Sequence, residues 1–273
     1  MLFHKHIPSS PLNNYIDFIL YLEGNNQGAG LPKTAMSMVF NLNDSFKLYS
    51  DHHFSSYTDY KKYWIAGLQL KPSYVESYGT SKMIVIQFKT IGAYLFLQHP
   101  LDIFTDTYTP LDNVYSKEAE ETWEQLQEAK TIKEKILQAE VFLYKKLLKD
   151  RLPHEKLLVA ANYLLNTSEF SSVEAVCKKT GVSRKHLNHL FKAYVGVSTK
   201  TMKSLHRFQY LLAEISKNPD LNLTSLAYEM DYSDMAHFSN DFKKLTGIYP
   251  TAYIKLVKEN PSLKIVPHFI PAS

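Results

Sequence analysis

The strongest constraint on this chain is a repeat near its C-terminus, in which two stretches of similar pattern follow each other. Val176 corresponds to Leu226, 50 residues later, and Gly196 corresponds to Gly247, 51 residues later. Each stretch has a short segment behind a polar residue, a turn, and a longer segment with one apolar face. This order predicts a helix-turn-helix in each stretch. Two such units in tandem indicate a protein that reads two segments of DNA.

The first unit carries start and stop signals for its helices. Ser171 and Glu174 have the spacing of a capping box, which satisfies backbone donors at a helix N-terminus. Gly181 suits the positive φ of the turn, Ser183 is placed to cap the longer helix, and Gly196 to end it. The apolar residues of that helix recur at i, i+3, i+4 and i+7 and should face the core: Leu187, Leu190, Phe191 and Tyr194.

The opposite face of the longer helix is basic and carries amide and imidazole groups. Lysine donates to guanine O6 and N7, asparagine pairs with adenine N6 and N7, and histidine reaches a base acceptor or a phosphate. The candidate DNA-binding residues of the first unit are therefore Ser183, Arg184, Lys185, Asn188, His189 and Lys192. Cys177, on the shorter helix, is interpreted as a small buried hydrophobe rather than a reactive thiol.

A long connecting helix and the second unit follow. The pattern predicts a helix over residues 199–217, roughly 28 Å long at ~1.5 Å per residue. A connector of that length can hold two recognition helices about one DNA turn, ~34 Å, apart. In the second unit Phe238 and Phe242 should face the core. Its candidate base-reading residues are Met235, Ala236, Ser239 and Asn240, with Lys243 as a phosphate contact.

Charge is distributed unevenly over the two units. Residues 171–207 contain eight Lys or Arg and one acid, whereas residues 220–250 contain two bases and five acids. A basic cluster on one small unit is typical of phosphate binding. Carboxylates near a recognition helix repel the same phosphates. We therefore expect the first unit to supply most of the affinity for DNA.

These features resemble a known family. Residues 155–257 are similar to the DNA-binding domain of the AraC/XylS family of bacterial transcription regulators. The matching run is Gly181-Val-Ser183, Leu187, Phe191-Lys192 and Gly196-Val-Ser198, then Tyr232-Ser-Asp234, His237-Phe238, Phe242-Lys-Lys, Gly247-Ile-Tyr-Pro250 and Tyr253. The sequence departs from the family pattern at a few positions. Arginine is usual at His189 and Asn240, a turn glycine at Asp231, and a proline at Thr199.

The resemblance implies a sequence-specific transcription regulator that binds double-stranded DNA, most often as an activator that meets RNA polymerase. It also implies an N-terminal regulatory domain, often a cupin-like barrel that binds a small effector, dimerises, or both. No catalytic activity and no cofactor are expected. A cytoplasmic location is expected, because there is one cysteine, no signal peptide pattern and no long apolar run for a membrane span.

Residues up to about 115 are expected to be mainly β-structure. Residues 36–43 alternate in polarity with a period of two, and residues 83–88 are apolar on both faces, as in a central strand. Residues 63–70 and 74–78 are candidates for neighbouring strands, because Pro72 suits a turn between them. A first helix is expected over residues 12–22.

From Ser116 onward the pattern is helical. We interpret one apolar stripe as packing against its own domain, with a dimer interface as the alternative: Ile132, Ile136, Ala139, Leu143 and Leu147. The expected fold class is α+β. It comprises a mainly-β regulatory domain over residues 1–150, a linker at 151–153, an all-α tandem helix-turn-helix domain over 151–260, and a tail over 261–273.

Two alternatives concern the N-terminal part. A metal-dependent cupin-type enzyme would need converging ligands, for which the candidates are His4, His6, His52, His53 and Glu76. Adjacent histidines on a strand point to opposite faces, and the first two candidates lie in a terminal stretch, so this interpretation is disfavoured. A regulator whose first domain only dimerises or meets a partner stays open beside effector binding.

Overall fold

The structure is a computed structural model of the 273-residue chain. It describes residues 2–24, 27–49, 51, 53–77, 80–147, 155–165, 172–260, 263 and 269–271. The expected linker at 151–153 lies outside these residues, so the domain boundary there stays a prediction. No helix in the described ranges is both long enough and apolar enough to cross a membrane.

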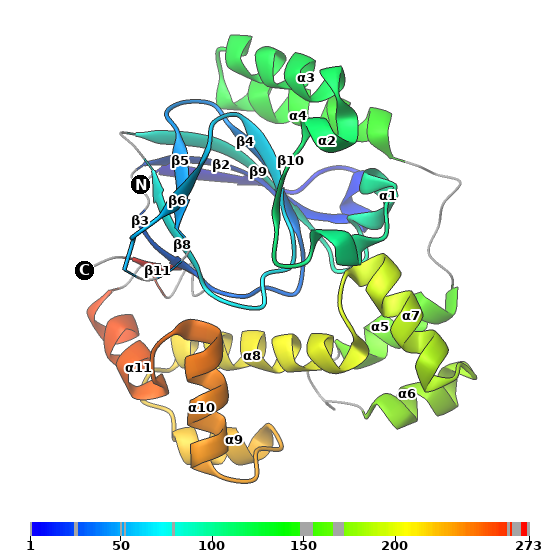
Figure 1. Ribbon diagram of the computed structural model, residues 1–273, viewed down its shortest axis with the longest axis vertical. Coiled ribbons are helices and arrows are strands. Elements are labelled where there is room, and N and C mark those ends of the chain that lie inside the picture. The colour runs from blue at the N-terminus through cyan, green and yellow to red at the C-terminus, as the bar shows by residue number, and fades with distance from the viewer. Residues whose placement is uncertain are drawn as a thin grey trace.

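The N-terminal region consists of two antiparallel sheets that face each other (Figure 1). The first has the order β1 (Leu2–His6), β2 (Ile16–Gly24), β9 (Ser81–Phe88), β4 (Ser37–Asn41), β7 (Tyr63–Ala66) and β10 (Tyr108–Pro110). The second has the order β11 (Phe269–Pro271), β3 (Gln27–Gly30), β8 (Ser73–Ser77), β5 (Phe46–Tyr49) and β6 (Tyr57–Tyr60). No strand of one sheet pairs with the other in the described part of the chain, so the expected cupin-like barrel is not closed.

Strand β4 confirms the period-two pattern but is buried on both faces. Val39 belongs to the intersheet core, which comprises Val39, Phe46, Trp64, Val75 and Met83. Met38 and Phe40 point the other way into the main core, a larger cluster that extends from Leu12 to Leu205. There Phe40 meets Phe142 edge-on, with ring centroids 5.8 Å apart. Strand β9 lies between β2 and β4, which confirms it as a central strand.

The helix expected over residues 12–22 is wrong. A short 3-10 helix, η1 (Leu12–Asn14), is followed directly by β2. Apolar residues at 12, 16 and 19 have helical spacing, yet all three are buried in the main core from extended or turn backbone. Backbone pairing of β2 with both β1 and β9 decides the conformation, and no local pattern reports those partners.

Strands β7 and β8 are not neighbours, which corrects the expected pairing of residues 63–70 with 74–78. Strand β7 pairs with β4 and β10, whereas β8 pairs with β3 and β5 in the other sheet. The chain leaves the first sheet at Gly67, where a Cβ would lie 1.6 Å from the carbonyl oxygen of Phe104. That close approach leaves no room for a Cβ, so the position requires glycine.

From Ser116 onward the structure is helical as expected, with α3 (Lys117–Glu128) and α4 (Ile132–Lys146). Three short helices that were not expected lie between β9 and Ser116: α1 (Tyr94–Leu97), η2 (Leu101–Phe104) and α2 (Asp112–Tyr115). In the apolar stripe of α4, Ile136, Ala139 and Leu143 are buried in the main core. The stripe therefore packs against its own domain rather than forming a dimer interface. A capping box between Thr131 and Glu134 begins this helix.

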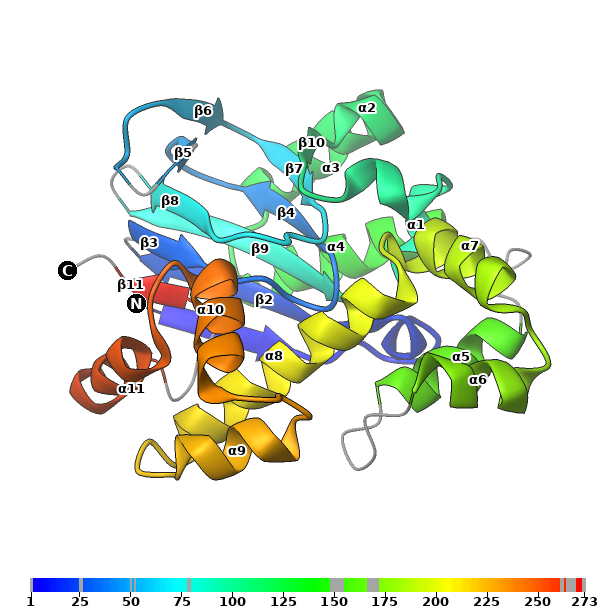
Figure 2. The same cartoon turned by 60° about the horizontal axis from the view of Figure 1, so that its bottom comes forward.

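The C-terminal region contains the two expected units (Figure 2). The first comprises α5 (Glu155–Leu164), α6 (Val173–Thr180) and α7 (Arg184–Val195), and α8 (Thr199–Lys217) connects it to the second. The second comprises α9 (Leu223–Glu229), α10 (Met235–Thr246) and α11 (Pro250–Glu259). The predicted cap Ser171 lies outside the described residues, and Ser172 accepts a hydrogen bond from the Ala175 N–H as the N-cap of α6.

The two units have different cores. The first unit contributes to the main core, in which Val195 and Leu205 lie in one cluster with N-terminal residues, and Cys177 packs partly buried against it. The second unit has a core of its own, which also contains one N-terminal residue. This second-unit core comprises Leu31, Phe208, Leu211, Leu212, Ile215, Leu226, Ala227, Met230, Tyr232, Phe238, Phe242, Tyr253, Val257 and Leu263.

Candidate DNA-binding surface

Helix α7 has the boundaries that the sequence predicts. Gly181 lies in the turn before it with φ of 65°, a conformation that glycine adopts readily. The Ser183 hydroxyl accepts a hydrogen bond from the His186 N–H at 3.3 Å. Gly196 ends the helix with φ of 102° and donates its N–H to backbone carbonyls of the last turn. These three residues fix where the recognition helix starts and stops.

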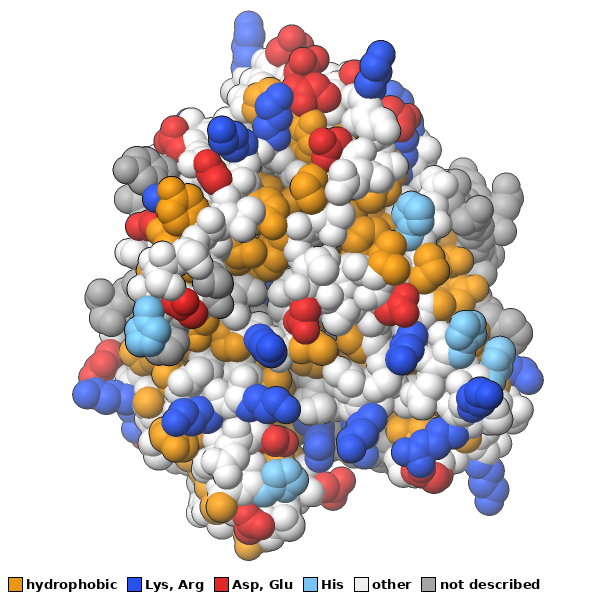
Figure 3. Space-filling view, in the orientation of Figure 1, with side chains coloured by type: hydrophobic (Ala, Val, Ile, Leu, Met, Phe, Trp, Pro, Cys, Tyr) orange, Lys and Arg blue, Asp and Glu red, His pale blue; other side chains and the backbone are white. Residues whose placement is uncertain are grey.

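The faces of α7 divide as expected. Leu187, Leu190 and Phe191 are buried, and Tyr194 packs partly buried against the main core. The opposite ridge is exposed and comprises Lys185, His189 and Lys192, with Arg184 at its start. In Figure 3, Lys and Arg side chains form a broken row across the lower half of the molecule, over α7, α8 and α10. A basic, solvent-facing helix of this kind can enter the major groove.

Asn188 and Arg184 have partners within the protein. The Asn188 Oδ1 atom accepts hydrogen bonds from the Thr199 hydroxyl at 2.7 Å and the Thr199 N–H at 3.2 Å. These bonds fix the start of α8 and occupy the acceptor that adenine pairing would use. The Arg184 guanidinium lies 3.0 Å from a Glu174 carboxylate oxygen, but both side chains are well exposed. Such a surface pair exchanges readily for a phosphate contact.

Helix α10 presents a less basic ridge. Ala236, Asn240 and Lys243 are exposed, whereas Ser239 is half-buried and Met235 packs against the second-unit core. The Lys243 ammonium lies 4.4 Å from the centroid of the Tyr249 ring. Of the five predicted residues, Ala236, Asn240 and Lys243 are therefore the most accessible to DNA.

Two aspartates shape the start of α10. Asp231 takes φ of 60° in the turn, the left-handed conformation that the family's glycine adopts without strain. Asp234 is the N-cap and accepts a hydrogen bond from the His237 N–H at 2.7 Å. That bond, with a second from the Ser233 hydroxyl, lowers the pKa of Asp234, so the exposed carboxylate stays ionised. Its charge therefore lies at the N-terminus of α10.

One of the eight basic residues in 171–207, Arg207, contacts the second unit. Arg207 donates from Nη1 to the Met230 carbonyl at 3.0 Å, and its guanidinium lies 5.2 Å from the centroid of the Tyr232 ring. These contacts hold the α9–α10 turn against α8. The count of bases in residues 171–207 therefore overstates the cations that are available to phosphates.

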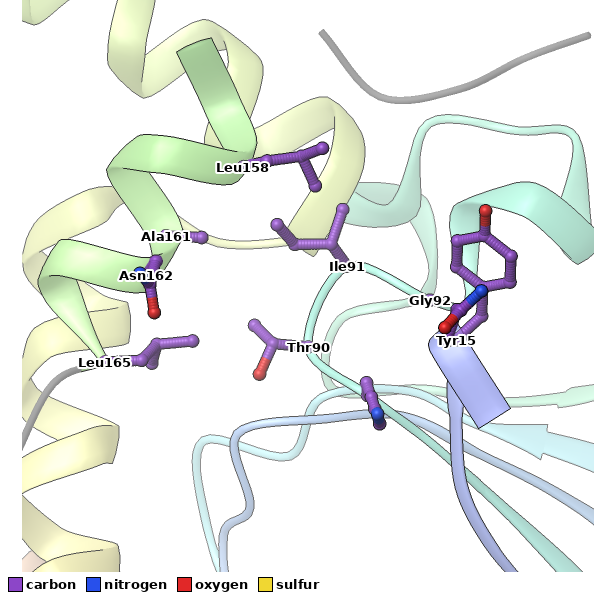
Figure 4. Close-up of a pocket in the computed structure, with 10 residues that line it drawn as sticks. Tyr15, Thr90, Ile91, Gly92, Leu158, Ala161, Asn162 and Leu165 are labelled. Atoms are coloured by element: carbon purple, nitrogen blue, oxygen red, sulfur yellow. The ribbon is translucent and has the colours of Figure 1, made fainter. Parts of the chain in front are cut away.

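A cavity of about 270 Å³ lies between the N-terminal domain and α5 (Figure 4). One wall comes from the end of η1, the residue after it and the segment that follows β9. The other comes from α5 and the residue after it. The lining is apolar with a few polar groups: Asn14, Tyr15, Lys89, Thr90, Ile91, Gly92, Leu158, Ala161, Asn162 and Leu165. The cavity therefore borders both domains, where a bound molecule would contact each of them.

The candidate metal ligands are not gathered in one place. His4 and His6 lie on edge strand β1, and His6 Nε2 is 3.2 Å from Glu140 Oε1. Glu76 lies on β8 of the other sheet and accepts a hydrogen bond from Tyr49. His52 is outside the described residues. Within those residues, no three His, Cys, Asp or Glu side chains are grouped to hold a metal ion.

The contacts of Asn188 lead to a prediction about stability. Asn188→Ala leaves both donors of Thr199, a residue that is 1% exposed, without their acceptor. We expect the free energy of unfolding, measured by urea denaturation, to fall by about 1–3 kcal/mol. Asn188→Asp keeps the acceptor and should stay near wild type. An Asn188→Ala variant as stable as Lys185→Ala, an exposed control on the same helix, would contradict this role.

Comparisons with known proteins agree with this arrangement. Residues 176–256 match a family described as "Helix-turn-helix domain", which is the AraC/XylS type, and residues 4–110 match a domain of unknown function, DUF6597. The Msm operon regulatory protein of Streptococcus mutans is 30% identical over 91 residues, which are 32% of this chain and 31% of that protein. The match thus spans about a third of that relative's length.

Two solved structures are also similar. ToxT from Vibrio cholerae has 11% identity and a TM-score of 0.46 over 87% of this chain and 97% of its own. The AraC-like transcriptional activator CuxR has 14% identity and a TM-score of 0.28 over 78% of this chain and 86% of its own. Residues 176–256 thus form a helix-turn-helix domain of the AraC/XylS type.

Proposed function

We propose that this chain is a transcription regulator that binds double-stranded DNA and reads two adjacent major-groove segments with α7 and α10. The observation that carries the proposal is the exposed basic ridge of α7, held on the same rigid connector as the exposed face of α10. Base contacts are assigned to Lys185 and His189. Phosphate contacts are assigned to Ser183, Arg184 and Lys192.

Binding of selected DNA by the purified chain tests this proposal. Lys185→Ala should cost about 1–3 kcal/mol and relax the base preference at one operator position. Lys192→Ala should weaken binding to all sequences alike. Log affinity of the wild type should fall steeply with log salt, because several counterions are released. Lys133→Ala, an exposed position on α4, is the control. Wild-type affinity and specificity in both α7 variants would place the reader elsewhere.

The two readers should contribute unequally. The first unit carries most of the exposed bases, whereas residues 220–250 contain five acids and two bases. In the second unit we assign modest neutral contacts to Met235, Ala236, Ser239 and Asn240, and a phosphate contact to Lys243. Its acidic surface and the exposed Tyr228 on α9 suit a protein partner. We propose RNA polymerase as that partner, with the chain acting as an activator.

The charge of Asp234 provides a sharp check of this asymmetry. Asparagine can cap α10 as aspartate does, so Asp234→Asn removes the charge and keeps the helix. We expect slightly tighter DNA binding in fluorescence anisotropy, because a repulsion of phosphates is lost. Ser233→Ala, next to it, should leave affinity near wild type. Equal losses from Lys185→Ala and Asn240→Ala, with equal protection of both half-sites in footprints, would show that the asymmetry is absent.

We further propose that a small effector binds in the cavity between the N-terminal domain and α5. Its apolar walls and the Lys89 ammonium suit a short amphipathic molecule with an anionic group. A ligand there contacts both domains, so its binding would alter how the first unit is held. An N-terminal domain that only dimerises or meets a partner is the alternative.

Filling the cavity tests this site. Octanoate should raise the thermal unfolding midpoint of the wild type, because it binds the folded state, and octanamide should raise it less. Leu158→Trp, which fills the cavity, should abolish the shift. Val159→Trp, an exposed position outside the lining on the same helix, should retain it. An equal shift in Leu158→Trp would move the site elsewhere, and no shift in the wild type would favour the alternative.

A further inference from the structure

The last described strand belongs to the N-terminal domain although it follows the second helix-turn-helix unit. Strand β11 lies on the edge of the second sheet, antiparallel to β3. Phe269 pairs with Gly30, and Pro271 pairs with Gly28. Figures 1 and 2 show β11 beside β3, with α11 nearby. Residues 269–271 thus pair with the N-terminal domain, although they follow the second unit in the sequence.

The side chains of β11 connect two hydrophobic cores. Successive residues of a strand point to opposite faces. Phe269 packs against the intersheet core of the N-terminal domain, whereas Ile270 packs against the second-unit core. Leu31, just after β3, is buried in that same second-unit core. One face of this short strand therefore packs against the N-terminal domain, and the other packs against the second unit.

Other contacts dock both recognition helices on the N-terminal domain by their C-terminal ends. At α7, the Thr105 hydroxyl donates to the Gly196 carbonyl at 2.7 Å. At α10, a Cβ on Gly247 would lie 3.0 Å from the Tyr74 hydroxyl oxygen. From α8, Gln209 Nε2 donates to the Pro32 carbonyl at 2.5 Å. The exposed ridges of α7 and α10 point away from these contacts and stay open to solvent.

We propose that β11 is an intramolecular clasp that fixes the second reader relative to the first, and so sets the spacing between the two DNA segments. The proposal rests on the proposed function. Within the described residues, α8 is the only element that contributes to both the main core and the second-unit core. Without the clasp, the angle between the readers depends more on the stiffness of that helix. If both recognition helices are already held in place, less conformational entropy is lost when they bind two DNA segments at once.

One glycine allows the clasp to be opened selectively. A Cβ on Gly28 would lie 2.1 Å from the Ile270 carbonyl oxygen and 2.9 Å from Pro271 Cα, both in β11. Gly28→Ala should therefore expel the tail. Gly30→Ala is the matched control on the same strand, because its Cβ would meet only the Ser73 carbonyl oxygen at an ordinary 3.7 Å. Truncation after Leu263 is a second route that leaves β3 unchanged.

The first arm of the test does not involve DNA. Amide hydrogen exchange should show faster exchange in β3 and in α9–α11 for Gly28→Ala and for the truncated chain. Gly30→Ala should match the wild type. Unchanged exchange in both altered chains would overturn the clasp. If Gly28→Ala fails to fold, the truncated chain decides this arm and the next one.

The second arm uses selected DNA and the same DNA with one base pair inserted between its two segments. The wild type and Gly30→Ala should bind the original site at least about tenfold more tightly than the spaced one. Opening the clasp should weaken binding to the original site severalfold and reduce that ratio severalfold. An unchanged ratio, or tighter binding to the original site, would overturn the proposal. A wild type that binds no DNA would instead refute the proposed function, while the exchange arm still reports on the clasp.

Discussion

The arrangement of the C-terminal region depends on the burial of one face of α8. Met202 and Leu205 lie in the main core, whereas Phe208, Leu212 and Ile215 lie in the second-unit core. Each such side chain stabilises the folded state by roughly 1.5–3 kcal/mol when fully buried. Because one continuous helix carries both sets, the two helix-turn-helix units pack against the same helix. Arg207 strengthens this link by holding the α9–α10 turn against α8.

The N-terminal domain contacts α7 and α10 at their C-terminal ends rather than on their exposed faces. Gly196 lies close against this domain, since a Cβ there would lie 2.9 Å from Met36 Cε and 3.1 Å from the Leu101 carbonyl oxygen. The tilted rings of Tyr94 and Tyr194, with centroids 4.1 Å apart, add a second contact at α7. A change at this seam can therefore alter the angle of α7 without covering its basic ridge. The cavity lies close by in the chain, because Ile91 and Gly92 of its lining come just before α1.

Local signals made the two units readable from the sequence. Ser183 caps α7, Gly181 takes positive φ, and Gly196 ends the helix, as the residue types predict. In the second unit, Asp234 caps α10 and Asp231 takes positive φ. Helical periodicity also separated the buried and exposed faces of α7. The same reasoning identified β4, β9 and the stripe of α4. These features depend on residues within a few positions of one another, so the sequence alone contains them.

Other features depend on partners far away in the chain. Strand β2 has helical apolar spacing and becomes a strand because β1 and β9 pair with it. From the sequence, Asn188 is a candidate base contact, but in the structure its Oδ1 atom accepts a hydrogen bond from Thr199. Arg207 counts among the bases available to phosphates, but in the structure it donates to the Met230 carbonyl. Position along the sequence identifies residues 261–273 only as a tail. The sequence by itself determined the two readers and their charges. Tertiary structure decided which side chains are free to read and how both units attach to the regulatory domain, because long-range pairing and packing set those contacts.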